Sequence, residues 1–122
     1  MANDFKRFTV SSVNTSVGAS ASAVYTVPAG AGSTALESIV IGITLANKTS
    51  TGVTASVFLD NYTGSNDVYI VKDAIIPAGS SLEVMSGNKI VLQNSGSAGD
   101  VVRVSSGTAT AIDATLSVLE DV

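Results

Sequence analysis

The feature that most constrains the fold of this chain is a two-residue alternation of apolar and polar side chains. In the segment 53–60, the apolar residues of one predicted strand face are Val53, Ala55, Val57 and Leu59. Successive side chains of a strand point to opposite faces, so this spacing is typical of a half-buried strand. The same alternation recurs over 81–85 and 114–119, and no window carries the apolar stripe of an amphipathic helix. The pattern therefore predicts an all-β protein.

Short clusters of Gly, Pro, Asn and Ser interrupt the alternation at regular intervals, and such clusters favour turns because Gly and Asn adopt positive φ at low cost. They occupy residues 28–32, 47–52, 61–67, 77–79, 86–88, 94–99 and 107–110. Between them we expect strands at about 5–13, 20–27, 35–46, 53–60, 68–76, 80–85, 89–93, 100–105 and 111–120. Roughly eight or nine short antiparallel strands at this spacing predict a β-sandwich of jelly-roll or immunoglobulin-like type, with a closed barrel as the alternative.

The expected domain organisation follows from one apolar segment and from the chain length. Residues 39–45 are apolar on both faces at their start, which favours a central strand covered on both sides. A chain of 122 residues fits one domain, and it contains neither an internal repeat nor a linker long enough to divide it. We therefore expect a single β-sandwich domain over 1–122 with a short N-terminal arm at about 1–12.

Charged side chains are scarce, which bears on how the protein is used. They make up 13% of the chain, against about 25% in ordinary globular domains. Ser, Thr, Asn and Gly must cover much of the surface instead, and part of that surface is expected to be buried against neighbouring subunits. We therefore expect a subunit of an assembly, with a homo-oligomer such as a trimer or a dimer.

The chain lacks the residue types that most enzymes depend on. It contains no histidine, the usual general base near neutral pH, and no cysteine. Neither a Gly-x-Ser-x-Gly motif nor a phosphate-binding glycine loop occurs. The ten acidic residues are scattered along the chain, so no pair stands out for acid–base catalysis. We expect no enzyme activity, no cofactor and no catalytic or metal-binding residue.

Charge and hydropathy argue against nucleic-acid and membrane partners. The net charge is −4 and Lys6-Arg7 is the only adjacent pair among six basic residues, whereas nucleic-acid binding needs clustered Lys and Arg. The longest apolar stretch, 39–43, is far shorter than the roughly 20 residues that cross a bilayer. No apolar run follows the charges of the N-terminus, so we expect synthesis in a cytoplasm without a secretion signal.

The segment 60–67 allows two interpretations. Its sequence, Asp-Asn-Tyr-Thr-Gly-Ser-Asn-Asp, supplies the oxygen ligands that calcium takes, but it lacks the EF-hand spacing and the closing Glu. The alternative is a polar turn in which Asp and Asn hydrogen-bond to nearby backbone groups.

The N-terminal segment is the best candidate for a partner interface. Phe5 and Phe8 flank Lys6-Arg7, so two of the three phenylalanines lie within four positions. One interpretation is an arm that docks on a partner, with aromatic side chains in pockets and Arg7 against an acidic patch. The other is an ordinary first strand whose Phe side chains cover the domain's own core.

Five segments of the chain carry a likeness to a known family. Two of them are Val-Tyr-Thr-Val-Pro-Ala-Gly at 24–30 and Tyr-Ile-Val-Lys-Asp-Ala-Ile-Ile-Pro-Ala-Gly-Ser-Ser-Leu at 69–82, and the others lie at 41–47, 88–92 and 114–120. In these segments the chain resembles small β-sandwich structural proteins of tailed-bacteriophage virions, in particular those of marine and cyanobacterial phages. The resemblance implies a virion component without enzyme activity, similar to capsid decoration (cement) proteins, and supplies no functional residue position by position.

From this resemblance we expect a capsid decoration protein on the outer virion surface, bound to the major capsid protein. A tail, neck or fibre-attachment subunit of the same kind of virion is one alternative. A carbohydrate-binding module is another, and it would need an exposed aromatic platform, for which the chain offers Tyr25, Tyr62 and Tyr69.

Overall fold

The computed structural model describes residues 3–62, 67–85 and 89–121. Within these ranges the chain forms one short 3₁₀ helix, η1 (Gly18–Ser20), and nine strands. The strands are β1 (Asn3–Val10), β2 (Ser22–Thr26), β3 (Leu36–Asn47), β4 (Val53–Asp60), β5 (Asp67–Ile76), β6 (Ser81–Glu83), β7 (Ile90–Asn94), β8 (Val101–Ser106) and β9 (Ile112–Asp121). Each predicted strand is present with ends shifted by a few residues, so the all-β prediction is confirmed. The predicted turn at 86–88 lies outside the described residues.

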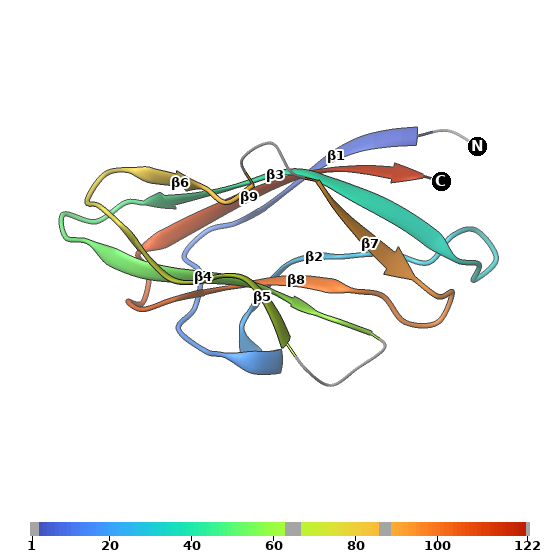
Figure 1. The fold of residues 1–122 in the computed structure, drawn as a ribbon, viewed down its shortest axis with the longest axis horizontal. Helices are drawn as coiled ribbons and strands as arrows, with labels where there is room; N and C mark the ends of the chain where they lie inside the picture. The colour runs from blue at the N-terminus through green and yellow to red at the C-terminus, as the bar shows by residue number, and fades with distance from the viewer. Residues whose placement is uncertain (1–2, 63–66, 86–88, 122) are drawn as a thin grey trace.

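The strands form two antiparallel sheets that pack face to face, which confirms the predicted sandwich (Figure 1). Sheet A has the order β1-β9-β3-β6, and β7 also pairs with β3. Sheet B has the order β2-β8-β4-β5. Because β1 pairs with β9, the first and last strands lie side by side (Figure 1).

The core lies between the sheets and consists mainly of aliphatic side chains. Sheet A contributes residues such as Val40, Leu116 and Val118, and sheet B contributes Val57 and Val104, none more than 1% exposed. These residues occupy alternate positions of their strands, so the two-residue period of the sequence is the reason that one face of each sheet is apolar and buried.

The expectation that residues 39–45 are covered on both sides is wrong. Along β3, Val40 and Ile43 face the core, whereas Ile41 is 42% exposed and Ile39 is half-buried. A β-bulge between Val40 and Gly42 interrupts the register with β9. The strand is central within sheet A, as expected, but only its inner face packs against sheet B.

Residues 3–10, which we expected to form an arm, are built into sheet A as an edge strand. Every residue from Asn3 to Val10 pairs with β9. The ring of Phe8 lies 4.7 Å from the ring of Tyr25 in sheet B, between centroids, and packs against the core. An unpaired segment would leave its backbone groups to water, whereas pairing with β9 satisfies them and places Phe8 over the core.

The segment between β1 and β2 leaves the core at Val13, runs beside β8, and brings Thr15 and Val17 to the outer face of sheet B. The backbone N–H of Ser106 donates to the carbonyl of Asn14 at 3.0 Å. Arg103 Nη1 donates to the carbonyl of Ala21 at 2.9 Å. In Figure 1 this segment, with η1, lies beyond β8 and β4 on the side away from sheet A. The crossing segment, residues 11–21, therefore forms one wall of a recess on sheet B.

Candidate functional site

The outer face of sheet A carries a line of four apolar side chains that crosses four strands. Phe5 pairs with Leu119, Leu119 pairs with Ile39, and Ile39 pairs with Val91. Directly paired residues of neighbouring strands point to the same face of a sheet. We call this set, Phe5, Leu119, Ile39 and Val91, the apolar row. Phe5 is 78% exposed and Val91 is 59% exposed, so the row presents large apolar side chains to solvent.

The structure divides the four predicted interface residues between the two faces of β1. Phe5 and Arg7 point outward, in register with Leu119 and Ser117 of β9. Arg7 is exposed and forms no ion pair within the described residues. Lys6 and Phe8 point inward, where they contact Glu120 and Tyr25. The outer face therefore offers a partner Phe5 and Arg7, while Lys6 and Phe8 support the fold.

A buried polar cluster lies beneath the apolar row and joins the two sheets. Glu120 of β9 is 2% exposed and its carboxylate lies 2.8 Å from the ammonium group of Lys6. The Tyr25 hydroxyl in sheet B donates to the other oxygen of Glu120 and lies 2.7 Å from the Ser38 hydroxyl. Because a buried carboxylate is costly without partners, these contacts are what allow Glu120 to lie inside the sandwich.

The cluster also favours the protonated forms of Lys6 and Tyr25. Burial, with a smaller contribution from the hydrogen bond to Glu120, raises the pKa of the Tyr25 hydroxyl. The hydrogen bond with Glu120 raises the pKa of Lys6. Both groups therefore keep their protons at neutral pH, and the hydrogen bond from the Tyr25 hydroxyl to Glu120 links the two sheets.

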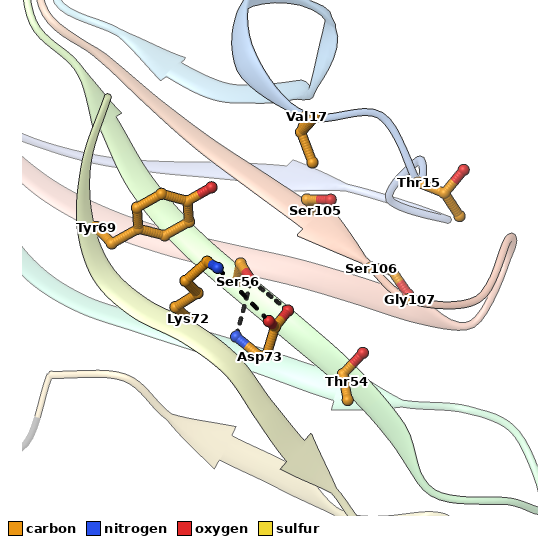
Figure 2. Close-up of a pocket in the computed structure, with 10 residues that line it drawn as sticks. All are labelled: Thr15, Val17, Thr54, Ser56, Tyr69, Lys72, Asp73, Ser105, Ser106 and Gly107. Carbon is orange, nitrogen blue, oxygen red and sulfur yellow. Dashed lines mark hydrogen bonds and ion pairs between the residues drawn. The ribbon is translucent and has the colours of Figure 1, made fainter. Parts of the chain in front are cut away.

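A recess of about 320 Å³ lies on the outer face of sheet B (Figure 2). The crossing segment forms one wall and β5 forms the other, with β4 and β8 as the floor. Figure 2 shows the side chains of Tyr69, Lys72 and Asp73 on the β5 side and those of Thr15 and Val17 opposite them. The other lining residues are Thr54, Ser56, Ser105, Ser106 and Gly107.

Backbone strain holds one carboxylate at the edge of the recess. Asp73 has a φ of 51°, in the left-handed region that few non-glycine residues adopt. Its N–H donates to the Ser56 hydroxyl at 2.9 Å, and that hydroxyl lies 3.4 Å from Oδ1 of Asp73. The ammonium group of Lys72 lies 3.9 Å from Oδ2. The register of β5 with β4 is also irregular at this point, and such irregularities redirect the side chains beside them.

Of the three tyrosines, only Tyr69 is placed to form part of an exposed platform. Tyr25 is 2% exposed, Tyr62 is half-buried, and Tyr69 is 40% exposed at the recess. The ring of Tyr69 lies 5.2 Å from the buried ring of Phe58, between centroids, and the Lys72 ammonium lies 5.7 Å from its centroid. Phe58 therefore supports the Tyr69 ring from the sheet.

The calcium interpretation of the segment 60–67 finds no support in the described part of that segment. Oδ2 of Asp60 accepts a hydrogen bond from Arg103 Nε at 3.0 Å. Residues 63–66 lie outside the described residues, so their contribution stays a prediction. Across 3–62, 67–85 and 89–121, no group of three or more acidic side chains is arranged to hold a metal ion.

Comparisons with known protein families, with curated proteins and with solved structures each gave no match to this chain. Within the described residues, no helix is long and apolar enough to cross a membrane. The case for function therefore depends on the two outer faces and on the sequence resemblance.

Sequence reasoning named Phe5, Arg7 and Tyr69 but missed the residues that accompany them. Leu119, Ile39 and Val91 join Phe5 only through the register of four strands, which is not visible in the sequence. The recess was missed because its walls come from the crossing segment and β5. The one available signal for the apolar row was the apolar run at 39–43, which we interpreted as a strand covered on both sides.

Proposed function

We propose that this chain is a non-enzymatic structural protein of a tailed-phage virion, and in particular a capsid decoration protein that binds the lattice of the major capsid protein. The resemblance over 24–30 and 69–82 supports a virion component. The lack of histidine and cysteine supports a passive role, because the usual nucleophile–base pairs cannot be assembled without them.

The observation that carries the proposal is the apolar row with Arg7 beside it. Protein interfaces place large apolar side chains at their centre and favour Arg among the charged residues. Phe5 and Val91 are each more than half exposed, and Arg7 has no ion-pair partner among the described residues. The proposed contact is therefore the outer face of sheet A against the shell, with Arg7 meeting an acidic group.

Such a protein acts by mass action. A protein that binds only the assembled lattice stabilises it by its own binding free energy. Contacts that bridge neighbouring capsid subunits would oppose the outward pressure of packaged DNA. A closed dimer or trimer would match a symmetry axis of the shell, and this oligomeric state belongs to the proposal.

The test is cosedimentation of purified protein with empty shells assembled from the major capsid protein. Deletion of residues 1–10 would remove an entire edge strand and uncover the core, so point substitutions on the outer face are the better probe. We expect Phe5→Ser and Arg7→Ser each to weaken binding, with a matched control, Thr9→Ser, that changes an exposed residue of the same strand. Binding unchanged by both substitutions would overturn the proposed contact.

A tail, neck or fibre-attachment subunit differs from a decoration protein in copy number. Quantified gels of purified particles should show hundreds of copies for a decoration protein, and at most a few dozen for a ring or fibre protein. A low copy number, combined with weaker binding after substitution of Phe5, would favour a tail, neck or fibre-attachment subunit over a decoration protein.

A further inference from the structure

We propose that the recess on sheet B is a binding site for a neutral saccharide. This inference depends on the recess alone and does not require the shell-binding proposal to be correct. It adds ligand binding to a protein that otherwise acts through protein contacts.

Hydroxyl groups without internal partners converge on the recess. Ser105 is only 7% exposed, and within the described residues its hydroxyl makes no hydrogen bond, although Figure 2 shows it on the recess floor. In the same part of the chain, the hydroxyls of Thr15, Thr54 and Tyr69 also lack hydrogen bonds. These hydroxyls reach solvent, since within the described residues no fully buried side-chain polar atom lacks a hydrogen-bond partner. They can therefore bind a ligand that both donates and accepts hydrogen bonds.

The charges of the recess favour a neutral ligand. Lys72 and Asp73 lie side by side, 3.9 Å apart between Nζ and Oδ2, and their charges cancel. An anion such as phosphate would meet the Asp73 carboxylate, and a cation would meet the Lys72 ammonium group. A purely apolar ligand would bury the hydroxyl floor without hydrogen bonds. A polyhydroxylated neutral molecule avoids all three penalties.

The ring of Tyr69 and the Asp73 carboxylate match two features of a sugar ring. The C–H bonds of a pyranose carry partial positive charge and pack against the negative face of an aromatic ring. A carboxylate can accept hydrogen bonds from two adjacent hydroxyls, and the strained φ of 51° holds Asp73 at the recess edge. The volume of about 320 Å³ lies at the lower end of the range for small-molecule sites, about 300–1,000 Å³, which favours one or two sugar units.

The experiment is a ¹H–¹⁵N NMR titration of the full chain with lactose, maltose, cellobiose and N,N′-diacetylchitobiose, with inorganic phosphate as the charged probe. We expect at least one disaccharide to shift the amide signals of Ser56, Tyr69, Asp73 and Ser105, with saturation in the millimolar range or below. Phosphate should leave these signals in place. No saturable shift with any disaccharide, or shifts confined to other residues, would overturn the proposal.

Two substitutions test the assignment of the site. Tyr69→Ala removes the ring and should weaken binding about 10-fold or more. Asp73→Asn keeps the side-chain shape and a residue type that tolerates positive φ, so it should fold normally and still weaken binding about 10-fold. Phe5→Ala, which removes an exposed aromatic ring from the other sheet, is the matched control. Undiminished binding by Asp73→Asn, or phosphate bound in preference to sugars, would also refute the proposal.

Failure of this test leaves the shell-binding proposal intact, because the two readouts use different faces. A protein that binds shells but no sugar refutes only the recess assignment. A protein that binds sugar but no shell keeps the recess and removes the decoration role.

Discussion

The outer faces of sheets A and B arise from the same alternation of residues, yet they differ in how their exposed groups are arranged. Sheet B also exposes apolar side chains, with Ile75 72% exposed beside Thr54, but around a recess lined with hydroxyls rather than in a row across four strands. Sheet A carries Phe5, Leu119, Ile39 and Val91 in one row, and η1 and the crossing segment lie on the other side of the molecule. Sheet B carries Ser56 and Ser105 in register, and the crossing segment runs beside β8. The comparison teaches that a row of exposed apolar side chains suits a protein partner, whereas a recess lined with hydroxyls suits a small polar ligand.

The supports beneath the two faces also differ. Below the apolar row, Glu120 is held by Lys6 and Tyr25 across the two sheets. On the sheet B face, Phe58 is fully buried under Tyr69 and the Arg103–Asp60 pair lies beside it. Each exposed feature therefore depends on a buried group of a different kind, one polar and one aromatic.

The largest expected effect is on shell binding by the sheet A face. The double substitution Phe5→Ser, Val91→Ser removes two exposed apolar side chains, each contributing roughly 1.5–3 kcal/mol when fully buried in a contact. We expect the affinity for shells to fall about 100-fold or more, measured by cosedimentation. The free energy of unfolding should change by less than about 0.5 kcal/mol per site because both residues are exposed. An affinity for shells that the double substitution does not change would contradict the assignment of shell binding to the outer face of sheet A.

The next effect is on stability, through the support of the same face. Glu120→Ala removes a buried carboxylate that binds Tyr25 and Lys6, and should lower the free energy of unfolding by about 2 kcal/mol. Urea denaturation followed by circular dichroism measures this change. Glu120→Gln keeps the shape and should cost less. If alanine costs no more than the exposed control Glu83→Ala, the cluster does not link the sheets.

A smaller effect is expected when a residue of the sheet B face is changed and binding to shells, assigned to sheet A, is measured. Tyr69→Ala lies on sheet B and should leave the affinity for shells within about 2-fold of the original, since surface changes distant from a contact add independently. Its unfolding free energy should fall by about 1 kcal/mol, because Phe58 loses its aromatic neighbour. Shell affinity reduced as strongly by Tyr69→Ala as by Phe5→Ser would place the partner on sheet B.

The smallest effect concerns pH, at the charged end of sheet A. The hydrogen bond from Lys48 and the backbone N–H of Ser12 lower the pKa of Asp113 below its ordinary value of 3.8. A lowered pKa in the folded state adds stability above the unfolded value, and this stability is lost as the pH falls through the folded value. Asp113 is 44% exposed, so the contribution should stay below about 1 kcal/mol.

The measurement for this last effect is urea denaturation at pH 7 and at pH 3 for the original chain and for Asp113→Asn. The original should lose slightly more stability than the variant between the two pH values. An equal loss in both proteins would show that the Lys48–Asp113 pair does not contribute.

The fold was predictable to the level of strands and class because both depend on local rules. Alternation set the buried face of β4 and β9, and glycine-rich clusters marked the ends of the strands. The prediction for 39–45 failed because periodicity shows that both faces are apolar but not whether anything covers them. The candidate sites were predictable only in part. The sequence indicated Phe5 and Tyr69, but not the residues that form the apolar row and the recess with them.

The sequence by itself determined that this protein is built of short antiparallel strands and that it contains neither histidine nor cysteine. Both follow from residue type and spacing, which act within a few positions. Tertiary structure alone decided that Phe5 lies in line with Val91, that Glu120 is buried against Tyr25, and that Asp73 faces Thr15 across a recess. These arrangements depend on strand order, register and the path of the crossing segment, which are set by packing between residues far apart in the chain.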